Sequence, residues 1–329
     1  MVSVVKHRDY SWDVLKSFLI VLVILGHWLE YGLKNGTNLI SYNFIYLFHM
    51  PLFILISGLF SSKKDKYQFR KSIMSLIETY IVVQVLYVLT SFFLQHKPFT
   101  WQQLYTPNAA AWYLLSLISW RSIIQVIPDR FLYSNCFFAV SILLSLMVGF
   151  LPFENELSIQ RTIAFLPFFL CGFLFKEKIR IGSESIIKKI VCCSLLFFIF
   201  IGCCFGLNRD VSFVTYCNTN YYTPPHPVWV LLLFRALYSV VASIMIYAII
   251  TLFPIINHSS FVSHLGEDTL FYYVYHIIIL RMCIIIIRYY NLPLSFPAIL
   301  LYSIISLVVL YFMGKIKIFR WVLTPISIH

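Results

Sequence analysis

Charge is scarce in this sequence of 329 residues: 12% are Asp, Glu, Lys or Arg, whereas 60% are hydrophobic. A soluble globular domain carries about 25% charged and about 45–50% apolar residues. This balance excludes a water-soluble enzyme, a disordered regulator and a secreted disulfide scaffold. The chain has long continuous apolar runs instead, which do not alternate with polar residues as the strands of an outer-membrane barrel would. We therefore expect an all-α polytopic membrane protein.

Metal-binding patterns are also missing. The eight cysteines form no CxxC pair and no zinc-binding spacing with histidine. Seven of them lie in apolar runs, where a thiol behaves as a small hydrophobe, and Cys217 lies in a loop. We expect no metal site and no disulfide. We also expect no cleavable signal peptide, because the first apolar run begins after Val14, is too long and lacks a small-residue cleavage site.

About ten apolar segments are long enough to cross a bilayer as helices. No internal repeat, low-complexity tract or linker divides them, so we expect a single membrane domain over residues 1–329. The predicted segments are 14–32, 38–60, 72–94, 111–127, 131–150, 159–175, 186–206, 228–253, 269–287 and 297–314.

The net charge of +12 marks topology rather than nucleic-acid binding, because the basic residues lie in short loops between apolar runs. Loops on the same face of the membrane as the amino terminus hold 18 Lys and Arg residues, whereas loops on the opposite face hold 5. The positive-inside rule therefore predicts that both termini are cytoplasmic. The longest loop of the opposite side, residues 207–227, is rich in aromatic residues. It could cap a substrate entrance, or it could be an ordinary interfacial belt.

The first segment carries four ionisable side chains along one line. Lys16 and His27 are 11 residues apart, which is three helical turns plus about 20°, and Asp13 and Glu30 lie close to the same face. Such a line predicts a polar path from the cytoplasm inward. The rise from Lys16 to His27 is about 16 Å, comparable to the reach of the pantetheine arm of coenzyme A. The alternative is a snorkelling Lys16 and a His27 that is hydrogen-bonded inside the bundle.

Five stretches carry recognisable motifs in order: Asp13 to His27, FHMPLFILISG at 48–58, AWYL at 111–114, FLPFFLCG at 165–172 and GEDTLFYYVYH at 266–276. Together they resemble the acyltransferase family three, whose members are bacterial multi-spanning O-acyltransferases that use acyl-CoA. Lys16 in place of the commoner Arg is similar to the fucose 4-O-acetylase-like branch. The chain departs from the family at Arg70-Lys71, where many members have two spaced arginines, and at Glu78-Thr79, where a proline is usual.

Acyl transfer to a hydroxyl needs a base, a site for the thioester and donors for the developing oxyanion. His27 is the expected general base, because neutral imidazole titrates near working pH, and the resemblance points to the same residue. Glu30 or His49 is expected to orient it, although His49 could equally be a core histidine. Arg235, Arg281 and His276 are candidate substrate or oxyanion contacts, with a structural hydrogen bond as the alternative for His276.

The phosphates of coenzyme A need cations at the cytoplasmic face. The candidates are Lys16, Arg70, Lys71 and Arg121, although most charges there also set the topology. Asp13 is expected at the same mouth or paired with Lys16. Trp112 is a candidate wall of the acyl pocket, with plain packing as the alternative.

The sequence thus predicts an integral-membrane O-acetyltransferase of the bacterial inner membrane. Its donor would be cytoplasmic acetyl-CoA, and its acceptor a hydroxyl of a cell-surface glycan or of its lipid-linked precursor.

We expect a cavity that runs from Lys16 past His27 and opens beneath the 207–227 loop, or else entry of both substrates from the cytoplasm. The alternative function is a transporter or flippase, which would be expected to show repeat symmetry or matched helix breaks, and the sequence shows neither. Direct transfer or an acyl-histidine, the acceptor and the oligomeric state stay open.

Overall fold

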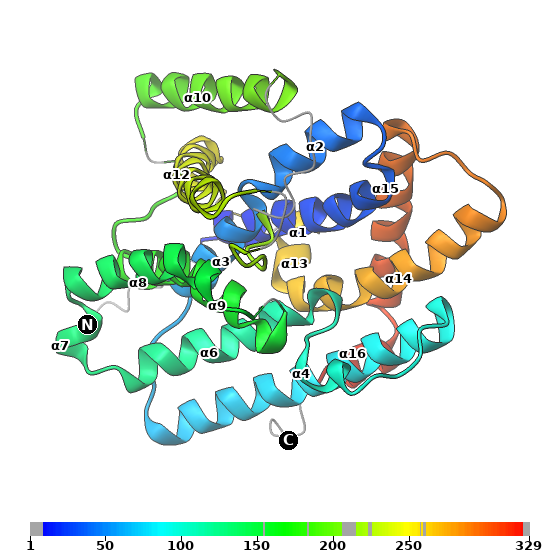
Figure 1. Ribbon diagram of the computed structural model, residues 1–329, viewed down its shortest axis with the longest axis horizontal. Coiled ribbons are helices and arrows are strands. Elements are labelled where there is room, and N and C mark those ends of the chain that lie inside the picture. The colour runs from blue at the N-terminus through cyan, green and yellow to red at the C-terminus, as the bar shows by residue number, and fades with distance from the viewer. Residues whose placement is uncertain are drawn as a thin grey trace.

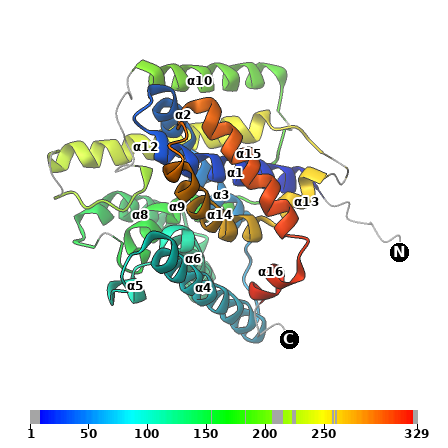
Figure 2. The ribbon, with the colours of Figure 1, turned by 90° about the vertical axis from the view of Figure 1, so that its right-hand side faces the viewer.

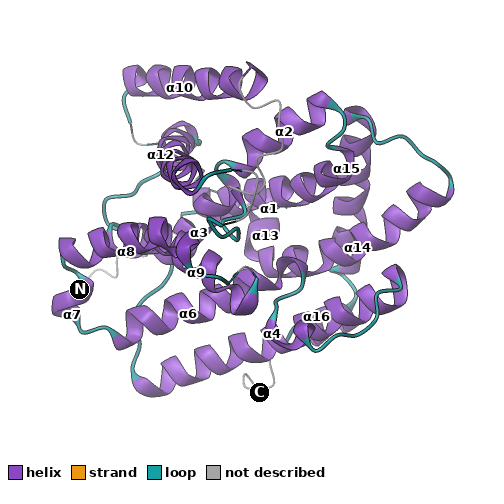
Figure 3. Ribbon diagram, viewed as in Figure 1, coloured by secondary structure: helices purple, strands orange, loops and turns teal. Residues whose placement is uncertain are grey.

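The computed structural model describes residues 9–153, 155–182, 184–205, 215–222, 226–256, 258 and 261–324 (Figure 1). Its regular elements in these ranges are helices, and no strand is drawn among them (Figure 3). Eight helical spans are long and apolar enough to cross a membrane. The prediction of an all-α polytopic membrane bundle is therefore confirmed. The number of membrane crossings and the side of the membrane on which the termini lie stay predictions. Residues 1–8 and 325–329 lie outside the described ranges.

Every predicted segment coincides with helical structure. Two segments form unbroken helices of 15 and 13 residues, α6 (Trp112–Val126) and α8 (Asn135–Met147). Four further short helices were not predicted: α5 (Gln102–Tyr105), α7 (Asp129–Leu132), α13 (Phe261–Glu267) and α16 (Lys317–Val322). The remaining long helices are α1 (Ser11–Leu29), α4 (Lys66–Gln95), α9 (Ile159–Leu174), α10 (Ile186–Phe205), α12 (Val228–Leu252), α14 (Thr269–Tyr289) and α15 (Phe296–Met313).

The second predicted segment is broken rather than continuous. It consists of α2 (Gly36–Tyr46) and α3 (His49–Leu59), separated by two residues. Pro51 explains the break, because its ring would clash with the carbonyl of residue 47 in an unbroken helix and it has no N–H to donate. The break leaves His49 at the start of α3, where its Nδ1 lies 2.9 Å from the carbonyl oxygen of Ile45.

Several helices are preceded by a residue whose side chain accepts a hydrogen bond from the first turn. Asn35 accepts a hydrogen bond from the backbone N–H of Thr37 at the start of α2, and Asp65 accepts one from Gln68 at the start of α4. Such caps satisfy N–H groups that have no partner within the helix. They fix where the polar loops end and the apolar spans begin.

Helix α1 lies at the centre of the bundle, where it packs against α3, α13, α14 and α15 (Figure 2). Its side chains Leu15 and Leu19 are completely buried. Helices α3 and α9 approach each other closely, because a Cβ at Gly58 or Gly172 would collide with the backbone of the partner helix. Small residues at such contacts let membrane helices pack backbone to backbone. In contrast, α10 lies at the periphery against α2 and α12, with most of its apolar surface exposed.

Candidate active site

A cavity of about 340 Å³ lies at the end of the bundle where α1 and α4 finish. Its volume falls within the range of about 300–1,000 Å³ that is typical of small-molecule sites. Lys97 and Ala109 are exposed at its rim. The other lining residues come mainly from α1, α3, α9, α14 and the loop at 215–216, and they include His27, Glu30, Tyr46, His49, Met50, Asn108, Trp112, Arg161, Phe165, Tyr216, Tyr273 and Arg281.

His27 and Glu30 are in contact on the cavity wall, with 3.1 Å between Nδ1 and Oε1. The pair arises locally, because residues three apart share a helix face, and the chain tightens into a 3-10 turn at Glu30–Gly32. The same carboxylate oxygen accepts hydrogen bonds from the hydroxyls of Tyr46 and Tyr216, the latter at 2.5 Å. The side chains of His27 and Glu30 are 24% and 27% exposed, so both remain accessible from the cavity.

The loop at 215–217 supports this pair. Burial raises the pKa of the Tyr216 hydroxyl, and the neighbouring Glu30 carboxylate acts in the same direction. Tyr216 therefore stays protonated and donates to Glu30. Burial also raises the pKa of the adjacent Cys217 thiol to about 11, so this thiol is neutral near pH 7 and is a poor nucleophile.

Two further histidines lie beside His27. The ring of His276 is 5.2 Å from that of His27 at an interplanar angle of 31°, and His276 is only 2% exposed. Its Nδ1 lies 3.1 Å from the carbonyl oxygen of Tyr272, and its Nε2 has no hydrogen-bond partner within the described ranges. His49 is also buried and lines the cavity, with its ring 4.6 Å from that of Tyr46. The structure thus brings together three of the predicted site residues on α1, α3 and α14.

Arg161 was not predicted as a site residue. The sequence placed it among the charges of the outer loops, yet it lies in the first turn of α9 and lines the cavity. Its guanidinium lies between the rings of Trp112 and Tyr216, at 5.1 and 5.7 Å, and its Nε donates to the backbone oxygen of Tyr216 at 3.2 Å. Among the described residues, this is the one hydrogen bond that Arg161 donates. The only sequence signal was its position inside a predicted apolar segment.

Arg281 lines the cavity, but its donors are engaged in joining three parts of the chain. It donates to the carbonyl oxygen of Tyr87 at 2.7 Å, to the hydroxyl of Thr90 at 2.6 Å and to the amide oxygen of Asn108 at 2.8 Å. These bonds hold α14 against α4 and the start of α6. By binding these residues, the guanidinium holds the segments that form the rim of the cavity in place.

Arg235 lies outside this cavity. It is buried on α12, its Nη2 donates to the carbonyl oxygen of Thr219 at 3.1 Å, and its guanidinium lies 5.0 Å from the ring of Tyr221. These contacts hold the loop at 215–222 against the bundle. The charge of Arg235 is thus accommodated by loop backbone and an aromatic face, which no pattern in the sequence specified.

The opposite end of α1 has a different environment. Lys16 Nζ is paired with Asp13 Oδ1 at 2.8 Å and lies 5.6 Å from the centre of the Phe60 ring. Neither Lys16 nor Asp13 lines the cavity that holds His27, because Leu19 and Ile20 between them are packed in the core.

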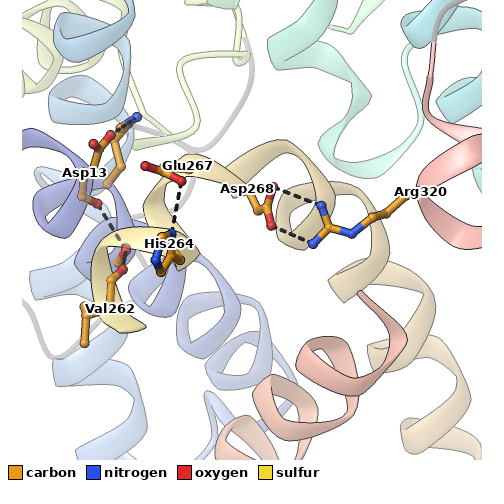
Figure 4. Close-up of polar contacts among 8 residues, drawn as sticks. Asp13, Val262, His264, Glu267, Asp268 and Arg320 are labelled. Atoms are coloured by element: carbon orange, nitrogen blue, oxygen red, sulfur yellow. Dashed lines mark hydrogen bonds and ion pairs between the residues drawn. The ribbon is translucent and has the colours of Figure 1, made fainter. Parts of the chain in front are cut away.

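The first turns of α1 are covered by α13 (Figure 4). Ser17 donates to the carbonyl oxygen of Val262, and Gly266 lies so close to Asp13 that a Cβ there would collide with its backbone oxygen. The stretch from Gly266 to His276 therefore contacts α1 at two places. The glycine packs against the start of α1, and the ring of His276 lies tilted beside that of His27. In the same region Asp268 pairs with Arg320 at 2.7 Å.

The other predicted cations lie apart from the cavity. Arg70 and Lys71 are exposed in the first two turns of α4, and Arg121 lies on α6 with a buried Nε that has no partner in the described part of the chain. No cluster of three or more His, Cys, Asp or Glu side chains suited to a metal occurs in the described ranges. The expectation that no metal is used stays a prediction.

The sequence model of a family described as an acyltransferase domain matches residues 9–314. The chain belongs to acyltransferase family three. Together with its apolar helices, this makes it a multi-pass membrane acyltransferase. The resemblance found in the sequence is therefore confirmed for the family, while the branch within the family stays a prediction.

Two curated relatives of this acyltransferase are both named nodulation protein NolL. The one from Mesorhizobium japonicum is 48% identical over 61 residues, which is 17% of this chain and 16% of the relative. The one from Sinorhizobium fredii is 41% identical over 61 residues, which is 17% of each chain. The match thus spans about one sixth of the length of these relatives. No solved structure matches the chain.

Proposed function

We propose that this acyltransferase moves an acetyl group from cytoplasmic acetyl-CoA to a hydroxyl of a cell-surface glycan or of its lipid-linked precursor. It would act in the bacterial cytoplasmic membrane, with the bilayer, acetyl-CoA and the glycan as its partners. The observation that carries the proposal is the His27–Glu30 pair on the wall of an open cavity. A histidine oriented by a carboxylate is the arrangement that general-base catalysis requires.

Glu30 would select the tautomer of His27. A carboxylate 3.1 Å from Nδ1 favours the tautomer in which Nδ1 carries the proton, which leaves the lone pair of Nε2 for catalysis. Tyr46 and Tyr216 hold the carboxylate in place through its Oε1 atom. His49 and the ring of His276 would restrict the motion of this group by packing beside it.

The proposed reaction is a direct transfer. Nε2 of His27 removes the proton of the acceptor hydroxyl while the hydroxyl oxygen attacks the thioester carbonyl carbon. The tetrahedral intermediate then collapses, the carbon–sulfur bond breaks, and the imidazolium returns the proton to the departing coenzyme A thiolate. This scheme needs one base and no protein nucleophile.

The developing oxyanion would be stabilised by Arg161. Its one hydrogen bond within the described ranges is made by Nε, and it shares the cavity with His27. A preorganised cation in a water-poor site is worth far more than the same cation in water. Trp112 stacks on Phe165 with ring centres 5.8 Å apart and would form the wall beside the acetyl group.

The donor would approach from the end of the bundle where α1 begins, and its pantetheine arm would have to pass the core side chains Leu19 and Ile20 to reach His27. Lys16, Arg70, Lys71 and Arg121 are the candidate contacts for its phosphates, with Asp13 as the resting partner of Lys16. The charge distribution supports this side as cytoplasmic. The acceptor would enter from the opposite end, where Lys97 and Ala109 form the exposed rim of the cavity.

The family assignment argues against the transporter alternative, because the family is one of acyltransferases.

A direct assay tests the proposal: the purified protein is incubated with acetyl-CoA and a panel of glycans, and free coenzyme A and acetylated glycan are measured by mass spectrometry. Thiol reagents are avoided because the chain has eight cysteines of its own. We expect both products in equal amounts with at least one glycan. Export of an unmodified sugar without coenzyme A release would contradict the proposal.

A further inference from the structure

A second cavity of about 650 Å³ lies between α8, α9 and α12. Apolar side chains from the three helices form most of its wall, among them Ile142, Phe168 and Ile244. Ile142 and Val240, which also line it, are 43% and 56% exposed. The cavity is therefore a groove that opens sideways on the surface that membrane lipid would cover.

The hydroxyl groups of the groove do not change its apolar character. Ser239 donates to the carbonyl oxygen of Arg235 at 2.9 Å, and Ser243 donates to that of Ser239 at 2.8 Å. Both bonds lie within α12, as is usual for serine in membrane helices. The middle of the groove thus matches a hydrocarbon chain rather than a sugar or a nucleotide.

One end of the groove is cationic. Lys178 and Arg180 follow the end of α9, line the groove and are exposed. Neither forms an ion pair within the described ranges, whereas Glu184, the acidic residue of the lining, is paired with Lys188 at 2.6 Å. The segment is held on α12 by a hydrogen bond from Gly182 N–H to the carbonyl oxygen of Ile250 at 3.1 Å.

We propose that this groove binds one anionic membrane phospholipid. Its acyl chain lies between α8 and α12, and its phosphate is bound by Lys178 and Arg180. Any lipid tail can fill an apolar groove, but the two cations without acidic partners give a preference for a negative headgroup. Each cation near an anionic lipid surface strengthens binding about fivefold.

This lipid is distinct from the proposed substrates. The cationic end of the groove lies where α9 ends, whereas the candidate active-site cavity is lined by Arg161 and Phe165 near the start of α9. Helices α3 and α9 contribute to both cavities with different residues. The lipid therefore contacts the scaffold of the active site without reaching His27.

Native mass spectrometry of the delipidated full-length protein tests this proposal, with phosphatidylglycerol and phosphatidylcholine of identical acyl chains as probes. We expect one phosphatidylglycerol to be retained at least fivefold more strongly than phosphatidylcholine. The double variant Lys178→Gln/Arg180→Gln should abolish this preference. The matched control Lys315→Gln/Lys317→Gln removes two exposed cations from the same predicted membrane side and should keep it.

Two further measurements distinguish the parts of the site. Ser243→Trp should fill the groove and weaken the retention of both lipids, because the site for the chain itself is occupied. Acetyl-CoA, added as a competitor, should not displace the bound phosphatidylglycerol. Equal retention of the two lipids by the unaltered protein, loss of the preference in the Lys315/Lys317 control, or displacement by acetyl-CoA would each overturn the proposal.

Discussion

Each end of α1 carries a basic and an acidic side chain in contact, but in different surroundings. His27 and Glu30 lie three residues apart on the wall of an open cavity, and the carboxylate is held by two tyrosine hydroxyls. Lys16 and Asp13 are also three residues apart, but they lie beside Phe60 and the short helix α13. Two residues from other parts of the chain, Tyr46 on α2 and Tyr216 in the loop, hold the first pair, whereas the second pair lies at the start of α1 beneath α13.

The difference shows that a shared helix face does not make a shared site. The spacing correctly placed all four side chains along one side of α1, yet Leu19 and Ile20 on the same helix pack into the core between them. Which of the four face a cavity depends on the neighbouring helices. The predictions below test whether only the His27 end takes part in the chemistry.

The largest expected effect is that of His27→Ala. Removal of a general base costs about 10²–10⁴-fold in turnover, and we expect a loss of kcat in this range. The rate of coenzyme A release by purified protein measures it. His96→Asn serves as a control because His96 is exposed, lies outside the cavity and has a left-handed backbone that asparagine tolerates. Near-normal turnover by a folded His27→Ala variant would remove His27 from the mechanism.

A smaller loss is expected for Glu30→Gln. The amide keeps the size of the side chain but loses the charge that favours the Nδ1-protonated tautomer of His27. A hydrogen bond to a charged group contributes about 1.5–3 kcal/mol, so kcat should fall about 10–100-fold. Acetyl transfer at saturating acetyl-CoA checks this. Unchanged kcat in the glutamine variant would show that Glu30 serves packing only.

Lys16→Ala sharpens the contrast between the two ends. If Lys16 contacts a donor phosphate, its loss should raise the KM for acetyl-CoA about fivefold and leave the KM for the acceptor nearly constant. Lys16→Arg should be tolerated better, because it keeps the positive charge. Steady-state kinetics with each substrate varied in turn measures the split. Normal donor kinetics combined with a lower thermal stability would instead support a snorkelling lysine.

Tyr216→Phe should have the smallest effect. It removes one of the two hydroxyls that donate to the Glu30 carboxylate, but Tyr46 still holds the same oxygen, so turnover should fall about threefold, less than for Glu30→Gln. Tyr222→Phe, in the same loop but exposed and outside the cavity lining, is the matched control. Equal activity of the two variants would show that Tyr46 alone is enough to hold the carboxylate.

Much of the fold followed from the sequence, because lipid-spanning helices need long apolar runs and every predicted run coincides with helical structure. The contact between His27 and Glu30 could also be predicted from the sequence, since a spacing of three residues brings two side chains together within one helix turn. In contrast, the role of Tyr216 depends on a loop that lies 186 residues from Glu30 in the chain. Arg235 shows the reverse case: its charge inside an apolar run suggested a cavity, whereas loop backbone and an aromatic ring accommodate it.

The central claim is that Glu30 acts through His27, and a double-mutant cycle tests it most directly. Coenzyme A release is measured for the unaltered protein, His27→Ala, Glu30→Gln and the double variant, each matched for folding by size-exclusion profile and thermal stability. Residues that act as a unit show non-additive effects. We predict that Glu30→Gln lowers turnover about 10–100-fold when His27 is present and has no further effect on the residual activity of His27→Ala. An equal loss in both backgrounds would contradict the account.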